Sequence, residues 1–250
     1  MSEKNCTVSR ALMYVGRVLL FCMAMTLTAF ILYALFRSFY GKSDSVSADA
    51  PEQAPKTVII DAGHGGMDGG AVSDGGILEK DVNLQISKRL YAFLQTLGIS
   101  CKMTRSEDIS LDGGVLKQKK LHDSKNRVLF AKNCDGCVFL SIHQNKFPQK
   151  KYSGLQVYYS KNDPYSKIFA DTIQSAVKEN LQKDNERQTK KATTAIYLLD
   201  NLHCPAVLAE CGFLSNDEEA QKLNDSTYQK QLTLVLSYAV TQFLQKYNNC

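Results

Sequence analysis

Apolar residues between positions 57 and 246 follow two patterns that alternate along the chain. Short runs of almost entirely apolar residues predict buried strands, at 57–61, 99–104, 137–143, 155–159 and 205–210. Longer stretches with apolar residues three or four positions apart predict amphipathic helices, at 81–98, 120–133, 163–181 and around 228–243. The alternation predicts an α/β fold: a single three-layer domain with a twisted, mostly parallel sheet and helices on both faces.

Residues 18–36 show neither pattern, because they form 19 consecutive positions without a charge. A helix of this length would span roughly 28 Å, close to the thickness of the apolar core of a bilayer. The apolar core of a signal peptide is usually shorter, about 7–15 residues, and the small residues at 48–50 lie too far away to mark a cleavage site. We therefore predict one transmembrane helix before the domain. A cleaved signal and a secreted protein are the alternative.

The charges around this segment predict its orientation. Three basic residues precede it, whereas the two basic residues that follow it are diluted by acidic ones. This asymmetry favours a cytoplasmic amino terminus. Residues 1–17 would then form a cytoplasmic tail, residues 18–36 a single-pass anchor in the cell membrane, and residues 57–246 a domain outside the cytoplasm. Residues 37–56, rich in Ser, Ala, Asp and Pro, have the composition of a linker.

Charge and cysteine content argue against a nucleic-acid-binding protein and against a cysteine-based zinc site. The chain carries 30 basic and 25 acidic residues, for a net charge of +5, without the concentrated basic stripe of a nucleic-acid-binding protein, so we expect no such partner. Six of its eight cysteines follow the linker, mostly within apolar runs where cysteine acts as a small hydrophobic residue. We predict that most of these six are unpaired. Cys134 and Cys137 have the spacing of half a zinc site, but no second pair follows at a suitable distance.

Candidate chemistry gathers at the ends of three predicted strands. His64 follows the first strand, His143 ends the 137–143 strand and Glu210 ends the last one. The carboxyl ends of strands form the functional edge of an open α/β sheet. Glu79, just before the first predicted helix, is a fourth candidate, although a carboxylate there could simply favour the helix dipole. Two histidines, one carboxylate and an open position form a catalytic zinc set, and a separate carboxylate can serve as general base.

The other two histidines lack such support. His122 lies among lysines and fits a solvated helix surface, and His203 fits a plain loop residue better than a substrate contact. A cysteine nucleophile built from Cys211 and His203 is disfavoured, because Cys211 continues an apolar strand instead of beginning a helix.

Five glycines surround His64 in the stretch IIDAGHGGMDGG, residues 59–70. Their spacing matches neither the dinucleotide-binding fingerprint nor a P-loop. A loop without side chains would let a bulky substrate approach, or would simply permit a tight turn after the strand.

Several stretches together resemble the zinc-dependent N-acetylmuramoyl-L-alanine amidases of family 3, which cut peptidoglycan. The resemblance covers about residues 57–246. It is carried by IIDAGHGGMDGGA (59–71), LEKDVNL (78–84), MTR (103–105), NRVLFAK (126–132), SIHQN (141–145) and LAECGFLSN (208–216).

The resemblance implies one Zn²⁺ held by His64, Glu79 and His143, with Glu210 as the catalytic carboxylate. It implies cleavage of the amide between N-acetylmuramic acid and L-alanine, and peptidoglycan strands with their stem peptides as the partner. We also expect Asn145, Gly65 and Gly66 to contact the substrate.

The sequence departs from the family pattern at two positions. Ala62 stands where the family usually has proline, and Gln144 stands where it usually has a small or apolar residue. Neither position carries chemistry.

An amino-terminal anchor followed by a single short domain is most similar to the spore-cortex amidases of this family. That likeness implies a role in forming muramic δ-lactam. A general wall-remodelling amidase, acting in division or autolysis, is the alternative role. A non-catalytic peptidoglycan-binding protein and a zinc exopeptidase that trims the stem peptide are alternative functions. Because such amidases are often switched on by another protein, an activator is a further expected partner.

Overall fold

The computed structural model describes residues 17, 19–34, 56–114 and 117–248. The chain divides into two units, Met1–Glu52 and Gln53–Cys250, and the boundary falls within the predicted linker. Residues 19–34 are helical and their side chains are exposed. Among the described residues, no helix combines the length and apolar character needed to cross a bilayer. The predicted anchor, tail and most of the linker extend beyond the described residues, so these assignments stay predictions.

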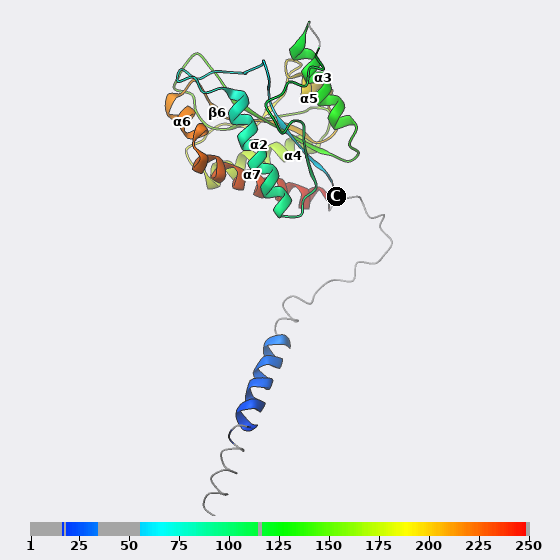
Figure 1. The fold of residues 1–250 in the computed structure, drawn as a ribbon, viewed down its shortest axis with the longest axis vertical. Helices are drawn as coiled ribbons and strands as arrows, with labels where there is room; N and C mark the ends of the chain where they lie inside the picture. The colour runs from blue at the N-terminus through cyan, green and yellow to red at the C-terminus, as the bar shows by residue number, and fades with distance from the viewer. Residues whose placement is uncertain (1–16, 18, 35–55, 115–116, 249–250) are drawn as a thin grey trace, which may run out of the picture. The chain divides into compact units, whose positions relative to one another are not determined.

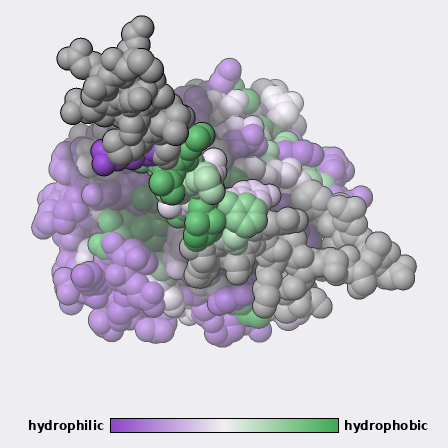
Figure 2. Space-filling model, turned by 90° about the horizontal axis from the view of Figure 1, so that it is seen from below, coloured by the Kyte–Doolittle hydropathy of each residue, from purple (hydrophilic) through white to green (hydrophobic). Residues whose placement is uncertain are grey.

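Exposed large apolar side chains are concentrated in the helical segment 19–34. In the view of Figure 2, hydrophilic residues cover most of the coloured surface, and hydrophobic residues show in smaller areas between them. In the second unit, the large apolar side chains are mostly buried, and exposed ones such as Met67 and Tyr238 are scattered.

Six strands form one sheet in the second unit, in the order β2–β1–β3–β6–β4–β5. The strands are β1 (Val58–Ala62), β2 (Cys101–Met103), β3 (Val138–Asn145), β4 (Gln156–Tyr159), β5 (Lys190–Lys191) and β6 (Ala206–Phe213). The first four in the spatial order are parallel to one another, whereas β4 runs antiparallel to β6 and β5 follows the direction of β4. The mostly parallel sheet is confirmed, and all five predicted strands are present. The two-residue strand β5 was not predicted.

Helices cover both faces of this sheet, as predicted (Figure 1). They are α2 (Glu79–Thr96), α3 (Lys119–Lys132), α4 (Tyr165–Asn180), α5 (Tyr197–Asn201), α6 (Asp217–Asn224) and α7 (Ser226–Asn248). Helices α2, α4 and α7 pack on one face, and α3 and α5 pack on the other. The short helices α5 and α6 were not predicted.

Alternating side chains of the central strands build a separate core on each face. In β1, Val58 and Ile60 join the core under α2, α4 and α7, whereas Ile59 joins the core under α3 and α5. Neighbouring β3 divides in the same way, with Leu140 in the first core and Phe139 in the second. Because both faces are buried, nearly every position of these strands is apolar, which is why they read as continuous apolar runs.

The register of the sheet brings the functional strand ends together. His143 of β3 pairs directly with Glu210 of the parallel strand β6, and the register then shifts before Asn145 pairs with Phe213. Glu79 is the first residue of α2, so the loop that leaves β1 ends beside the same edge.

The first and last described residues of the second unit lie near the amino ends of the parallel strands, at the end of the sheet opposite His143 and Glu210. Lys56 precedes β1, and its ammonium nitrogen lies 4.4 Å from the ring centre of Tyr247 near the end of α7. The Tyr247 ring stacks on Phe243 of the same helix. This contact therefore lies at the amino ends of the parallel strands, away from His143 and Glu210.

The described residues include Cys22 and five of the six cysteines that follow the linker, and all of them are free thiols. Cys101, Cys137 and Cys211 are buried, as the predicted strands required. We expect mass spectrometry of the alkylated, unreduced protein to find most of the six cysteines after the linker unpaired, because the two cores stabilise the fold without cross-links. Two or more native disulfides would contradict this prediction.

Candidate metal centre

The loop after β1 places His64 at the carboxyl edge of the sheet. The imidazole Nδ1 lies 2.8 Å from Oδ2 of Asp68, four residues later. This contact leaves Nε2 directed toward Glu79, whose Oε2 lies 3.2 Å away. Asp68 also contacts Nζ of Lys120 from α3 at 3.2 Å. A carboxylate on the far side of a histidine ring fixes its orientation and tautomer, as behind many metal-binding histidines.

Glu79 lies between the two histidines and is almost completely buried. Its Oε1 lies 2.9 Å from Nδ1 of His143, and its Oε2 accepts a hydrogen bond from the backbone N–H of Ala71 at 2.7 Å. Asn83 and the backbone N–H of Gln144 also donate to Oε1. Burial alone would raise the pKa of Glu79, but the two adjacent histidines outweigh it and hold this pKa far below its usual range.

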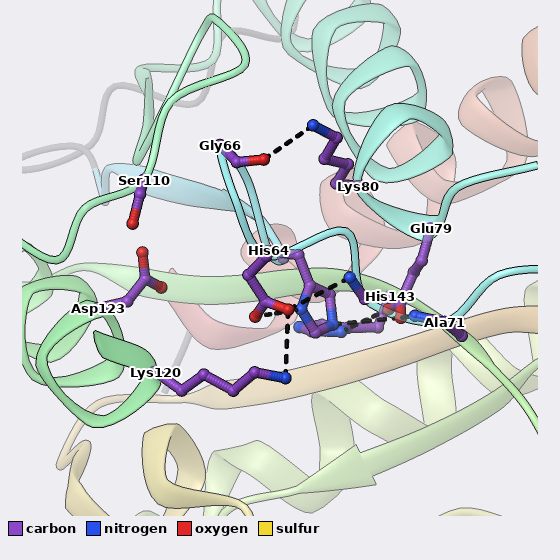
Figure 3. A network of polar contacts seen from close by, with 12 residues as sticks. His64, Gly66, Ala71, Glu79, Lys80, Ser110, Lys120, Asp123 and His143 are labelled. Carbon is purple, nitrogen blue, oxygen red and sulfur yellow. Dashed lines mark hydrogen bonds and ion pairs between the residues drawn. The ribbon is translucent and has the colours of Figure 1, made fainter. Parts of the chain in front are cut away.

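His64, Glu79 and His143 form the one group in the described part of the chain with three or more side chains arranged to hold a metal ion. Their ligand atoms lie within 4.8 Å of one another, and the three side chains point toward a common point (Figure 3). In a tetrahedral zinc site with bonds of about 2.0–2.2 Å, ligand atoms lie roughly 3.3–3.6 Å apart. The two histidine-to-carboxylate distances, 2.9 Å to Oε1 and 3.2 Å to Oε2 of Glu79, lie a little below that spacing, and two imidazoles with one carboxylate are ligands that zinc prefers. The donor set therefore suits zinc.

The electrostatics of His64 also favour a cation at this position. Burial lowers the pKa of His64, but the carboxylates of Glu79 and Asp68 outweigh burial and bring the pKa above its usual value. The surroundings thus stabilise positive charge on the imidazole, and a metal ion would supply that charge in place of the proton.

Glu210 lies beside this group without joining it. Glu210 is the register partner of His143 in the parallel strands β3 and β6, and its buried Oε2 has no hydrogen-bond partner among the described residues. Burial is the main cause that raises the pKa of Glu210 to about 7. A buried carboxyl with a free oxygen and a pKa near neutrality has the properties of a general acid or base.

The glycines around His64 have a packing role that the sequence did not indicate. A Cβ on Gly63 would lie 2.2 Å from Nε2 of His143, and a Cβ on Gly70 would lie 2.5 Å from Oε2 of Glu79. Glycine at these two positions lets the side chains of the metal group approach the loop closely.

Gly65 and Gly66, which we predicted to contact substrate, lie against another loop of the protein. Added Cβ atoms would come within 2.2 Å of the carbonyl oxygen of Ile109 and 2.8 Å of the backbone nitrogen of Ser110. Gly65 is buried and both glycines have positive φ, so the fold alone requires glycine here. Their contact with substrate stays a prediction without structural support.

Gly63→Ala will disrupt the metal centre more than Gly69→Ala. A methyl group added at position 63 would overlap the His143 ring, whereas one added at position 69 would make an ordinary contact at 3.5 Å with Leu78. Neither glycine has a positive φ, so backbone strain does not distinguish them. We expect zinc affinity to fall at least about tenfold in Gly63→Ala and to stay near wild type in Gly69→Ala, by chelator competition. Equal affinities would contradict the packing role of Gly63.

The remaining sequence candidates fall into two groups. Asn145 ends β3 at the same edge and is half-buried, so it stays a candidate for substrate contact. His203 lies exposed before the amino end of β6, whereas Cys211 lies fully buried near the carboxyl end of that strand. Burial also raises the pKa of Cys211 far above its usual value. The two cannot act as a nucleophile and its base, which agrees with the rejection of that alternative.

Sequence reasoning missed several polar residues behind the metal centre. Asp68 was present in the glycine-rich stretch, and its spacing of four residues from His64 was the available signal. Arg105 and Arg127 were quoted within the MTR and NRVLFAK motifs without a role, yet both are buried beneath the His64 loop. Gln144 also lies beneath the edge, where its side chain donates to Asn83.

Comparison with known proteins agrees with this geometry. Residues 58–242 match the profile of amidase family 3, described as N-acetylmuramoyl-L-alanine amidase. The germination-specific N-acetylmuramoyl-L-alanine amidase of Bacillus subtilis (strain 168) is 35% identical over 205 residues, which cover 81% of this chain and 85% of that protein.

Solved structures show the same likeness. The CwlD amidase of Clostridioides difficile, determined in complex with the GerS lipoprotein, superimposes with a TM-score of 0.72 at 38% identity and covers 76% of this chain and 98% of that one. The amidase AmiC2 of Nostoc punctiforme gives a TM-score of 0.66 at 31% identity, covering 77% and 99% of the two chains.

Proposed function

Because this chain belongs to family 3 of the N-acetylmuramoyl-L-alanine amidases, we propose that it cleaves the amide between N-acetylmuramic acid and L-alanine with one zinc ion. His64, Glu79 and His143 would hold the ion, and Glu210 would be the catalytic carboxylate. The observation that carries the proposal is the convergence of two imidazoles on one buried carboxylate, next to a second carboxylate whose buried Oε2 has no hydrogen-bond partner among the described residues.

The two carboxylates have different surroundings, which supports different roles. Both oxygens of Glu79 contact histidine nitrogens. Glu210 lies outside the group, and its buried Oε2 has no hydrogen-bond partner in the described part of the chain. A carboxylate that lies between two imidazoles can share a metal ion with them. A carboxylate with a free oxygen can take up and release a proton.

Zn²⁺, when bound, polarises the amide carbonyl and makes a neighbouring water more acidic. Glu210 takes the proton of the attacking water and returns it to the departing nitrogen of L-alanine. Asp68 keeps the His64 ring in place during these steps, and Asn83 does the same for Glu79. The same residues thus hold the site rigid while one proton moves through Glu210.

A digest of purified peptidoglycan tests the reaction. We expect a new free amine on L-alanine and no new reducing ends of the glycan. A free amine elsewhere in the stem peptide would indicate the exopeptidase alternative. Binding of peptidoglycan without any cleavage, by protein shown to contain zinc, would indicate the non-catalytic alternative.

We assign the activity to spore-cortex peptidoglycan, where it would take part in forming muramic δ-lactam. The support is the likeness to a protein named as germination-specific, which covers most of both chains. Expression of this chain in a spore former that lacks its own cortex amidase should restore muramic δ-lactam. Absence of the lactam, with wall cleavage intact in vitro, would favour the general wall-remodelling role.

A membrane anchor at residues 18–36 and a lipoprotein partner complete the proposal. The uncharged stretch supports the anchor, and the complex of the CwlD amidase with the GerS lipoprotein supports a partner of that kind. We expect the mature protein to fractionate with membranes, its domain outside the cytoplasm. A mature amino terminus within residues 38–55 would show that the segment is a cleaved signal instead.

A further inference from the structure

The backbone that carries His64 is held in an unusual conformation. The φ angle of His64 is 61°, in the left-handed region that residues with a Cβ rarely adopt. Among the described non-glycine residues, Gln118 alone shares a positive φ. Such conformations persist only where the surroundings hold them in place. The partners of the carbonyl groups along this turn show what holds it.

Two buried arginine side chains bond three consecutive carbonyl groups, those of Ala62, Gly63 and His64. Arg127 of α3 donates through Nη1 to Ala62 and through Nη2 to His64, both at 2.8 Å. Arg105, which follows β2, donates through Nε to Ala62 at 2.8 Å and through Nη2 to Gly63 at 3.0 Å. Each arginine is only 2% exposed, so water does not compete for these bonds.

Two carboxylates hold Arg127 in turn. Asp61 is fully buried and contacts Nη1 at 2.5 Å, and Asp123, one turn earlier in α3, contacts Nε at 2.5 Å. Hydroxyl groups of Thr104 and Ser141 donate to Asp61 and help keep it ionised. Burial alone would raise the pKa of Asp61, but Arg127 and these hydroxyls bring it below its usual value. Arg127 thus meets two carboxylates and two carbonyls at once, which a guanidinium can do and a lysine ammonium cannot.

We propose that Arg127 is a positioning residue of the metal centre, which fixes the backbone from which the His64 ring reaches Glu79. The inference rests on the proposed function, because it takes His64 to be a zinc ligand. Arg105 holds the same turn from the side of α2, where it also donates to the carbonyl oxygen of Lys80. Arg127 bonds the backbone of His64 and not its imidazole, so the effect on the metal passes through backbone geometry.

Arg127→Lys in the full-length protein tests this role. The variant keeps a positive charge near Asp61 but cannot bond both carbonyls. We expect zinc affinity, measured by chelator competition, to fall roughly 10–100-fold, the usual effect of losing a residue behind the ligands. The visible absorption of the cobalt-substituted protein should change as well, because the ligand geometry relaxes. Arg89→Lys is the matched control, since Arg89 also donates from Nε, to Gln229 at 3.1 Å, far along α2 from the ligand.

The outcomes separate this inference from the proposed function. A folded Arg127→Lys protein with wild-type zinc affinity and cobalt spectrum would overturn the positioning role alone. Wild-type zinc affinity together with a lower melting temperature of Arg127→Lys would show that Arg127 serves only the stability of the fold. If Arg127→Lys does not fold, Arg105→Lys provides the same measurement on the same turn. A wild-type protein that binds no zinc would overturn the proposed function, and the inference with it.

Discussion

Glu210→Gln will leave zinc bound while kcat falls by roughly 10²–10⁴-fold, the usual contribution of a general base. Glutamine is nearly isosteric with glutamate but cannot accept and return a proton. Glu210 lies outside the metal group and its Oε2 has no partner among the described residues, so the substitution removes no ligand and breaks no hydrogen bond of that oxygen. Zinc content and turnover on purified peptidoglycan are the measurements.

Glu79→Gln is the matched control for this prediction. Both oxygens of Glu79 contact histidine nitrogens, so loss of its charge should lower zinc content as well as activity. A metal-free Glu210→Gln protein, or a fully loaded and active Glu79→Gln protein, would show that the two roles are reversed or wrong.

The wild-type pH profile provides a second readout of Glu210. A general base must be ionised, and burial raises the pKa of Glu210 to about 7 without metal. The rate should therefore rise with pH, and bound zinc should shift this rise to lower pH, because a nearby cation favours the carboxylate. The acidic limb of the profile should disappear in the residual activity of Glu210→Gln.

His143→Ala will lose zinc and reduce wall cleavage to background. The ring supplies one of three metal-binding groups and lies 4.9 Å from the His64 ring, measured between ring centres. His143 is only partly buried near the end of β3, so the fold should survive, as circular dichroism can verify. His122→Ala, on α3 and outside the metal group, is the control and should keep both properties. Full activity of His143→Ala would remove this residue from the site.

The sequence predicted the fold, and the grouping of the candidate residues, where local pattern and sheet geometry coincide. Because both faces of the central strands are buried, the strands appear as apolar runs. Because parallel strands have their carboxyl ends on one side of the sheet, the sequence alone predicted that His64, His143 and Glu210 lie close together. Glu79 followed from its place at the start of an amphipathic helix. The separate roles of Glu79 and Glu210 did not follow from pattern and came from the family likeness.

Features that depend on contacts between distant segments could not be predicted. Strand β5 has two residues, too few to show a period, and it exists because it pairs with β4. Arg127 appears in the sequence as one more charge on a helix with many, and only packing shows that it lies under the His64 turn. For the same reason, Gly65 and Gly66 suggested an open loop, whereas the chain around Ile109 and Ser110 packs against them.

The contact between Lys56 and Tyr247 has a consequence for how this enzyme can be built into larger assemblies. The first and last parts of the described domain meet there, with the Lys56 ammonium nitrogen 4.4 Å from the ring centre of Tyr247. Proteins whose ends lie close together usually tolerate circular permutation and insertion into a host loop. A short connector joining the ends, with new termini opened in an exposed loop, should therefore give an active permutant. Fusion partners joined to the domain beside Lys56 or Tyr247 would leave the catalytic edge unobstructed, which suits immobilised or modular wall-lytic reagents.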